Sequence, residues 1–146
     1  MFKSILLPTE GSPLSEKATS TAVQFAQLNG ARIVAVTVVA PYPLMPTVAD
    51  AGPVIDASVY DQQMQTSARL SIGAVEAAAQ AAGVPFLGVV ALSGNPYEEI
   101  IETAQKYGCD IIVMASHHRS GLSKLFLGSE TDKVLAHTEL PVLVLH

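Results

Sequence analysis

Apolar and polar positions follow two different periods along the chain, and these periods alternate from one end to the other. Short runs rich in apolar and β-branched residues occupy 5–7, 33–39, 84–90, 111–115 and 141–145. Such runs are typical of strands that are covered on both faces. Between them, apolar residues recur every three or four positions, which indicates helices that each pack by one side. The sequence therefore predicts alternating strands and helices.

Local signals give approximate bounds for the first two helices. Ser12 suits an N-cap and Pro13 suits the first turn of a helix, which Gly30 then ends. A second helix is predicted over about 62–82, with Gly83 as its stop. The stretch before it, from Pro41 to Asp61, contains several breakers and is predicted to be a long surface loop. Its apolar residues are expected to pack back over the domain, with a flap over a site as the alternative reading; they are Tyr42, Leu44, Met45, Val54 and Ile55.

The last two helices have clear starts. Asn95 followed by Pro96 and by Glu98 three positions after the cap has the pattern of a capping box, and Gly108 ends that helix. A short helix is predicted over 129–137. The acidic pair Glu98 and Glu99 is explained by its place in a first helical turn, where the helix dipole favours negative charge.

This order of elements predicts the fold class. The whole chain, residues 1–146, is expected to form one α/β domain with a five-stranded parallel sheet in the order 3-2-1-4-5 and helices on both faces. Ligands of such doubly wound sheets bind outside the carboxyl ends of the strands where the winding reverses, which here lies between the first and fourth strands. The two rims of that crevice are residues 8–12 and 116–118.

Composition and charge narrow the choice of partners. The chain has a formal net charge of −5, which argues against binding to a nucleic-acid polymer through its backbone charge. One cysteine, Cys109, excludes an internal disulfide and a four-cysteine zinc site, and is expected to be an inert packed thiol. The apolar run before Pro8 is too short for a signal peptide, and no apolar stretch approaches the ~20 residues of a membrane span. We expect a cytoplasmic protein without membrane attachment.

Two kinds of chemistry find little support in the residues. The adjacent His117 and His118 point to opposite sides in extended chain, so no metal site is expected there. Ser12, Ser116 and Ser129 lack a nucleophile-elbow pattern, which argues against serine hydrolysis. No general base, nucleophile and oxyanion arrangement can be assembled, so no efficient catalysis is expected.

The loop after the fourth strand carries the clearest motif. Small residues allow close approach to a ligand, and the free amides at the helix start, where Ser129 is a natural cap, attract an anion. The loop resembles the signature of the universal stress protein family, which is Gly-x-x-Gly, nine residues, and then Gly followed by Ser or Thr. Ala115 and His118 stand at the first two glycine positions, and Gly128 and Ser129 complete the pattern after a nine-residue gap. The resemblance extends along the whole chain, including residues 8–12, Asn95-Pro96 and the final strand.

The resemblance implies a Rossmann-like domain of the adenine nucleotide alpha hydrolase type that forms homodimers. Some members bind ATP in the crevice, here with Mg²⁺ as the expected companion ion. The positions that would hold the nucleotide are Pro8, Thr9, Glu10, Val38, Met114, Ala115, His117, His118, Gly128, Ser129, Glu130 and Thr131.

Three departures from the family pattern leave two functions open. Ala115 adds one methyl group, and Glu10 replaces the usual aspartate with a side chain one methylene longer. His118 replaces a glycine, so its imidazole would occupy the space of the phosphates, or would supply positive charge to them. The first function is an ATP-binding stress-response module with at most slow ATP hydrolysis. The second is a nucleotide-free stress protein that acts only through protein contacts. In both, the apolar edge strand Val142–Leu145 is expected to pair with a second copy.

Overall fold

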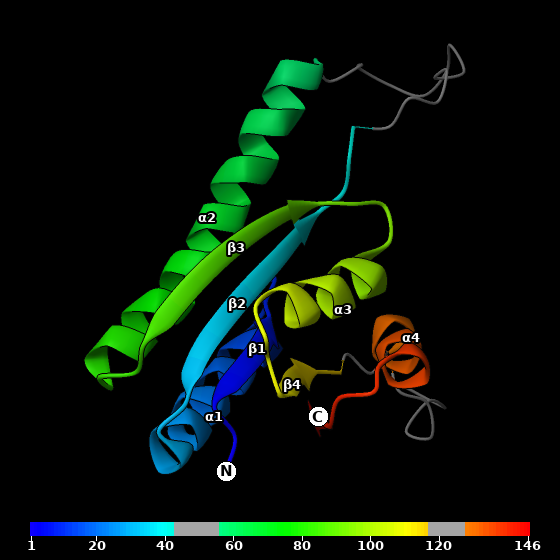
Figure 1. Cartoon of the computed structure of the whole chain (residues 1–146). Helices are drawn as coiled ribbons and strands as arrows, with labels where there is room; N and C mark the ends of the chain where they lie inside the picture. Colours follow the sequence, from blue (N-terminus) through cyan, green and yellow to red (C-terminus); the bar gives the residue numbers. More distant parts are fainter. Residues whose placement is uncertain (43–55, 117–127) are drawn as a thin grey trace.

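The computed structural model describes residues 1–42, 56–116 and 128–146 (Figure 1). A parallel five-stranded sheet in the order β3-β2-β1-β4-β5 forms its centre. This confirms the predicted fold class and strand order. Along the chain the elements are β1 (Ser4–Pro8), α1 (Pro13–Asn29), β2 (Arg32–Val39), α2 (Ala57–Ala81), β3 (Phe86–Leu92), α3 (Pro96–Lys106), β4 (Ile111–Ala115), α4 (Ser129–His137) and β5 (Val142–Leu145).

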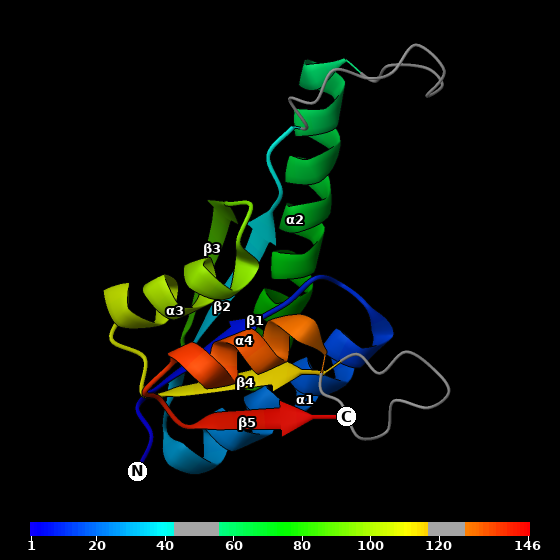
Figure 2. The ribbon, with the colours of Figure 1, turned by 90° about the vertical axis from the view of Figure 1, so that its right-hand side faces the viewer.

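The helices cover the sheet in two layers, with α1 and α2 on one face and α3 and α4 on the other (Figure 2). Side chains of the central strands alternate between the two layers, as the pleat of a strand requires. Ile5 and Leu7 pack toward α1 and α2, whereas Leu6 between them packs toward α3 and α4. All three are fully buried. The apolar runs of the sequence therefore mark strands that are covered on both faces.

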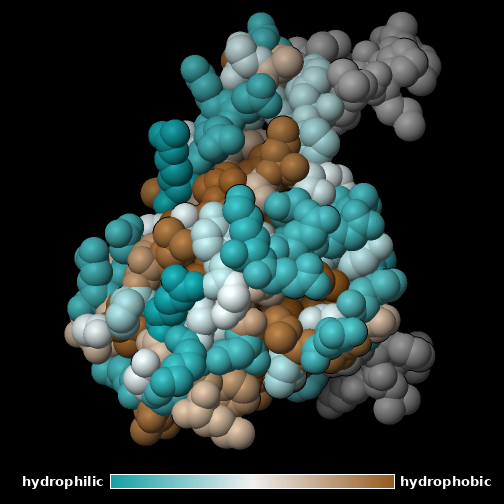
Figure 3. Space-filling view, viewed as in Figure 1, coloured by the Kyte–Doolittle hydropathy of each residue, from teal (hydrophilic) through white to brown (hydrophobic). Residues whose placement is uncertain are grey.

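One glycine allows α2 to lie close to the edge of the sheet. A Cβ built on Gly88 of β3 would lie 2.5 Å from Cγ2 of Ile72, closer than two carbon atoms can approach. Beyond this contact, apolar surface remains where the carboxyl end of β3 passes α2 (Figure 3), and Val90 and Leu92 are exposed on β3. Among the described residues, no helix is both long and apolar enough to span a membrane.

Element boundaries differ from the predicted ones mainly around α2. This helix begins at Ala57 rather than at residue 62, because the Asp56 carboxylate caps it by accepting the N–H of Ser58 at 2.8 Å. The prediction of a loop as far as residue 61 was therefore wrong. Of the apolar loop residues, only Tyr42 is among the described ones, and its ring packs edge-on against Tyr60 at 5.4 Å. The other four lie outside the described residues.

The predicted caps of the last two helices are only partly right. Asn95 occupies the N-cap of α3 as predicted, but its side chain makes no cap hydrogen bond, so the capping box does not form. Instead, Oε2 of Glu130 in α4 accepts the N–H of Tyr97 at 3.1 Å, and a distant residue caps the helix. Ser129 is the first helical residue of α4, and Gly128 occupies its N-cap. The predicted cap at Ser12 is confirmed, because its hydroxyl accepts the N–H of Ser15 at 3.2 Å.

Candidate functional site

The central strands part at their carboxyl ends. β1 pairs with β4 at Ile5↔Ile111 and Leu6↔Ile112, although the two strands continue to Pro8 and Ala115. Each strand keeps its outer neighbour to the end, through Pro8↔Val36 and Ala115↔Leu145. The opening coincides with the reversal of winding, where doubly wound sheets bind ligands. The structure therefore places the separation of β1 from β4 where the sequence predicts the crevice.

The rim formed by β1 is fixed to β2 through its backbone. The N–H of Thr9 donates to the carbonyl of Val36 at 2.9 Å, and the Thr37 hydroxyl donates to the carbonyl of Thr9 at 2.9 Å. Thr9 is buried, whereas Glu10 beyond it is exposed. Val38, near the end of β2, is half-buried and packs toward α3 and α4. Of the residues predicted on this side, the structure thus places Glu10 where its carboxylate reaches solvent.

A hollow of about 280 Å³ opens beside this rim, between α1 and α2. Gly11 forms its wall with φ of +80°, and a Cβ there would lie 2.9 Å from the Ser71 hydroxyl oxygen. The left-handed turn therefore favours glycine here, and the missing side chain leaves room for the Ser71 hydroxyl of α2. The α2 residues had no sequence signal, because only the fold brings α2 beside the turn that follows β1. The full lining is Thr9, Glu10, Gly11, Ser15, Glu16, Thr19, Ser67, Leu70, Ser71, Ala74 and Val75.

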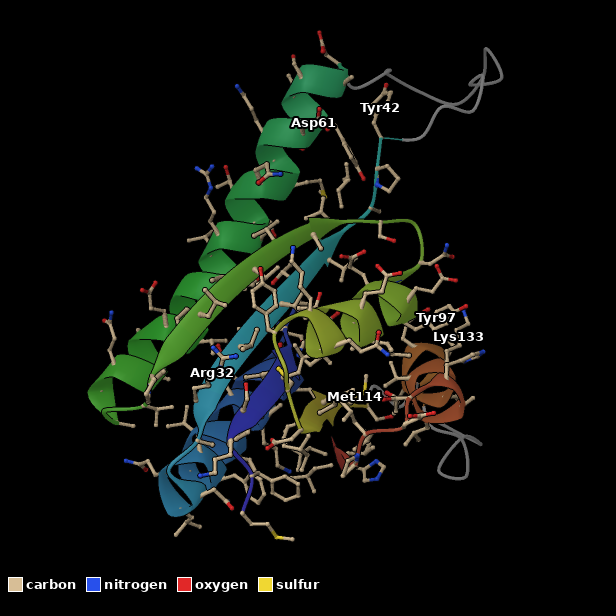
Figure 4. The ribbon with its side chains drawn as sticks, in the orientation of Figure 1. Arg32, Tyr42, Asp61, Tyr97, Met114 and Lys133 are labelled. Atoms are coloured by element: carbon tan, nitrogen blue, oxygen red, sulfur yellow. The ribbon has the colours of Figure 1, made fainter. Side chains whose placement is uncertain are left out.

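The rim formed by β4 passes from core residues to a buried serine. Met114 is buried against the α3 and α4 layer (Figure 4), and Ala115 is half-buried on the opposite face. Ser116 is 1 % exposed; its N–H donates to the carbonyl of Leu145 at 2.8 Å, and its hydroxyl oxygen accepts the N–H of Gly128 at 3.0 Å. Sequence reasoning weighed Ser116 only as a nucleophile and missed this role. Its one sequence signal is a small hydroxyl residue placed directly after a strand.

The start of α4 leaves donors open. Its first α-helical bond runs from the N–H of Asp132 to the carbonyl of Gly128, so the amides of Ser129, Glu130 and Thr131 have no intrahelical acceptor of this kind. Gly128 has no side chain with which to cap them. Free amides at the positive end of a helix dipole attract an anion. Thr131 is buried and Ser129 is exposed, so at this turn Ser129 also offers its hydroxyl.

The side chain of Glu130 is used within the fold. One carboxylate oxygen accepts the Tyr97 N–H, and the other lies 3.3 Å from Nζ of Lys133. Lys133 also lies 5.6 Å from the centre of the Tyr97 ring, and Figure 4 shows the two side chains together beside α3 and α4. A hydrogen bond to Glu98 is the main reason that the pKa of Tyr97 is raised. The Glu130 amide is therefore left open at the start of α4, while its carboxylate connects α4 to α3.

The remaining predicted positions fall into two groups. His117 and His118 lie outside the described residues. Cys109 is buried near the opposite end of the sheet, and burial raises the pKa of its thiol, which agrees with an inert packed residue. Within the described part of the chain, no group of three His, Cys, Asp or Glu side chains could hold a metal ion.

Known proteins resemble the chain over its full length. The model of the universal stress protein family matches residues 1–146. A universal stress protein of Thermus aquaticus is 30 % identical over 144 residues, which are 99 % of this chain and 98 % of that protein. A universal stress protein of Methanocaldococcus jannaschii is also 30 % identical over 144 residues, which are 99 % of this chain and 82 % of the relative.

Solved structures share the fold. The structure of MJ0577 from M. jannaschii has a TM-score of 0.80 at 26 % identity, covering 99 % of this chain and 96 % of that one. A universal stress protein in complex with cAMP has a TM-score of 0.73 at 20 % identity, covering 99 % and 97 % of the two chains. A universal stress protein from Archaeoglobus fulgidus in complex with dAMP has a TM-score of 0.70 at 15 % identity, covering 100 % and 98 %.

Proposed function

This chain belongs to the universal stress protein family, and we propose that it binds ATP in the crevice between β1 and β4 as a small stress-response module. The observation that carries the proposal is the position of the uncapped first turn of α4 beside the parted carboxyl ends of those strands. Two proteins of the same fold are complexes with the adenine nucleotides cAMP and dAMP. A phosphate chain directed at α4 would leave the base on the side of Thr9 and Val38.

Mg²⁺ accompanies the triphosphate in this proposal. The ion prefers oxygen ligands and commonly takes one or two from carboxylates, with the others from phosphates and water. Glu10 and Ser129 present an exposed carboxylate and an exposed hydroxyl on the two rims. These donors fit an ion that arrives with the nucleotide. We therefore expect Mg²⁺ alone to give no binding heat and Mg²⁺ with ATP to give a saturable signal.

Equilibrium titration with ATP and Mg²⁺ tests the proposal. Adenosine and inorganic triphosphate, titrated separately, measure what the base side and the phosphate side contribute. Saturable binding of ATP, with weaker binding of both fragments, is the expected result. Lack of association up to millimolar ATP would contradict the proposal. Phosphate release measured in the same samples should be slow, because the crevice lacks a recognisable nucleophile and base among its described residues.

The second candidate is a nucleotide-free protein that acts through protein contacts. His118 favours it, because a glycine stands at this position in the family signature and an imidazole would compete for the phosphate space. Replacing His118 with Gly should strengthen ATP binding if the side chain obstructs the phosphates. Unchanged or weaker affinity in that variant would show that the imidazole is no obstacle. We place the protein in the cytoplasm in either case, in keeping with its single unpaired and buried thiol.

We further propose that two copies pair through β5. This strand forms one edge of the sheet, and its four residues are all half-buried. Leu143 and Leu145 pack against the α1 and α2 layer and Val142 packs against the other, whereas Val144 belongs to neither cluster. Val144→Arg should therefore disrupt pairing with little damage to the core. Light scattering at micromolar concentration should give a dimer mass for the wild type and a monomer mass for the variant. A monomeric wild type would refute the pairing.

A further inference from the structure

Ser116 connects three elements at the edge of the crevice. Its N–H donates to the last residue of β5, Leu145, and its hydroxyl oxygen accepts the N–H of Gly128, which lies twelve positions later in the sequence. At 1 % exposure, this hydroxyl is shielded from solvent. Figure 2 shows β4 and β5 side by side, with α4 passing over them. One buried side chain therefore joins the ends of two strands to the start of a helix.

The bond from Gly128 changes which amides can meet a ligand. A backbone N–H donates one strong hydrogen bond at a time, so the Gly128 amide is not available to an anion while Ser116 holds it. The next two amides along the chain, those of Ser129 and Glu130, begin α4 and have no intrahelical acceptor. The hydrogen bond between Gly128 and Ser116 thus fixes the backbone that carries these two amides.

We propose that Ser116 is the positioning residue of the phosphate side of the crevice. Its hydroxyl holds Gly128 as a structural anchor, and the amides of Ser129 and Glu130 are the donors to the phosphates. The inference rests on the proposed function and assigns different roles to neighbouring amides of the same turn. Without the hydroxyl, the Gly128 N–H has no acceptor. The turn is then no longer held in the position in which the amides of Ser129 and Glu130 meet the phosphates.

The chain offers a matched control for the loss of a buried hydroxyl. Ser4 is 4 % exposed and lies at the amino end of β1, at the opposite edge of the sheet from the crevice. Its hydroxyl oxygen accepts a hydrogen bond from Nε of Arg32 at 2.9 Å. Ser4→Ala should therefore lower stability much as Ser116→Ala does, but at a distance from the crevice. Ser116→Thr keeps the hydroxyl, so it tests whether a hydroxyl at this position is enough to preserve ATP affinity.

The experiment combines ATP affinity with amide NMR on the full chain. In the wild type, ATP with Mg²⁺ should shift the amide resonances of Ser129 and Glu130 more than that of Gly128. Hydrogen exchange of the Gly128 amide should be protected in the wild type and in Ser116→Thr, and faster in Ser116→Ala. We expect Ser116→Ala to weaken ATP binding roughly tenfold, the effect of losing about one good hydrogen bond. Affinity in Ser116→Thr and Ser4→Ala should stay within about threefold of the wild type.

The outcomes separate the two proposals. If ATP shifts no amide resonance of the wild type at millimolar concentration, the proposed function fails and the role of Ser116 fails with it. If ATP binds but Gly128 responds most strongly, or if Ser116→Ala keeps full affinity, only the role of Ser116 is refuted. Equal loss of affinity in Ser4→Ala would also refute it, because the effect would then follow stability. Unfolding curves of every variant show whether Ser116→Ala is folded, and Ser116→Thr carries the test if it is not.

Discussion

The helices α1 and α4 both begin at the carboxyl edge of the sheet, one after each strand that borders the crevice. Their first turns nevertheless differ. At α1, the Ser12 hydroxyl accepts the N–H of Ser15, so the first turn is capped by its own chain. At α4, Gly128 holds the same position and has no side chain to offer. Two helix starts with the same dipole therefore differ in what remains for a ligand.

This difference bears on how the proposed ligand would lie. A capped turn has already satisfied one of its backbone donors, so it binds an anion less well than an open turn does. Under the proposed function, we expect the phosphates at the open turn of α4 and the uncharged part of the ligand at the β1 rim, which is fixed to β2 through Thr9. The dipole of a helix thus creates the potential for anion binding, and one N-cap residue decides whether it is available.

The largest expected effect comes from giving α4 the cap that α1 has. Gly128 has φ of −58° and ψ of 148°, a backbone conformation that any residue can adopt. In Gly128→Asp, the new carboxylate should accept the first-turn amides and repel phosphate. We expect ATP affinity to fall by at least about tenfold, while stability rises by about 0.5 kcal/mol from the cap and the helix dipole. Isothermal titration and urea unfolding measure the two changes.

Gly128→Ala is the control for this change. It adds a Cβ without a cap, so stability should fall slightly and ATP affinity should stay near that of the wild type. Gain of stability with loss of binding in the Asp variant is a combination that simple misfolding does not produce. Undiminished ATP affinity in Gly128→Asp would show that the phosphates do not lie on this helix.

The sequence predicted almost all of the fold and missed the detail on which this comparison depends. Apolar runs and stop signals gave the bounds of α1, β4 and α4, and the alternation of strands with helices led to the strand order. The pattern also favoured Ser129 as the cap of α4, one position later than the actual N-cap, Gly128. Within the sequence, a serine at a helix start indicates a capped turn. Only the backbone geometry shows that this turn is open.

Contacts between distant residues explain the other errors. The capping box at Asn95 does not form: the N–H of Asn95 donates to the Ser93 hydroxyl, and the N–H of Tyr97 donates to Glu130 from another helix. The tie between Ser116 and Gly128 likewise joins residues that no local pattern relates. Propensity and periodicity act over a few neighbouring residues, whereas the site is assembled from loop ends that the sheet brings together. The fold was therefore predictable, whereas the hydrogen bonds that hold the helix starts in place were not.

A smaller effect is expected from removing the cap that α1 has. Ser12→Ala leaves the Ser15 N–H without its acceptor and should destabilise the protein by about 1 kcal/mol. Because this turn is not assigned to the phosphates, ATP affinity should change less than about twofold. Ser12→Asp should restore the stability. A loss of affinity in Ser12→Ala that Ser12→Asp reverses would show instead that the two helix starts share the ligand.

The smallest effect concerns the acidic residue in the first turn of α4. Glu130→Gln keeps an oxygen that can accept the Tyr97 N–H but removes a negative charge beside the proposed phosphates. Stability should fall by no more than about 0.5 kcal/mol, since the lost ion pair with the exposed Lys133 is worth little. ATP affinity should rise about twofold at low salt, and the gain should shrink as salt screens the charge. Asp132→Asn removes a charge from the same turn without touching α3, so it should give a similar salt-dependent gain and no loss of the Tyr97 contact. Weaker binding in Glu130→Gln alone would mean that the Glu130 carboxylate takes part in binding. The first turn of α4 would then differ from that of α1 in two ways, a carboxylate that binds the metal ion and a missing cap.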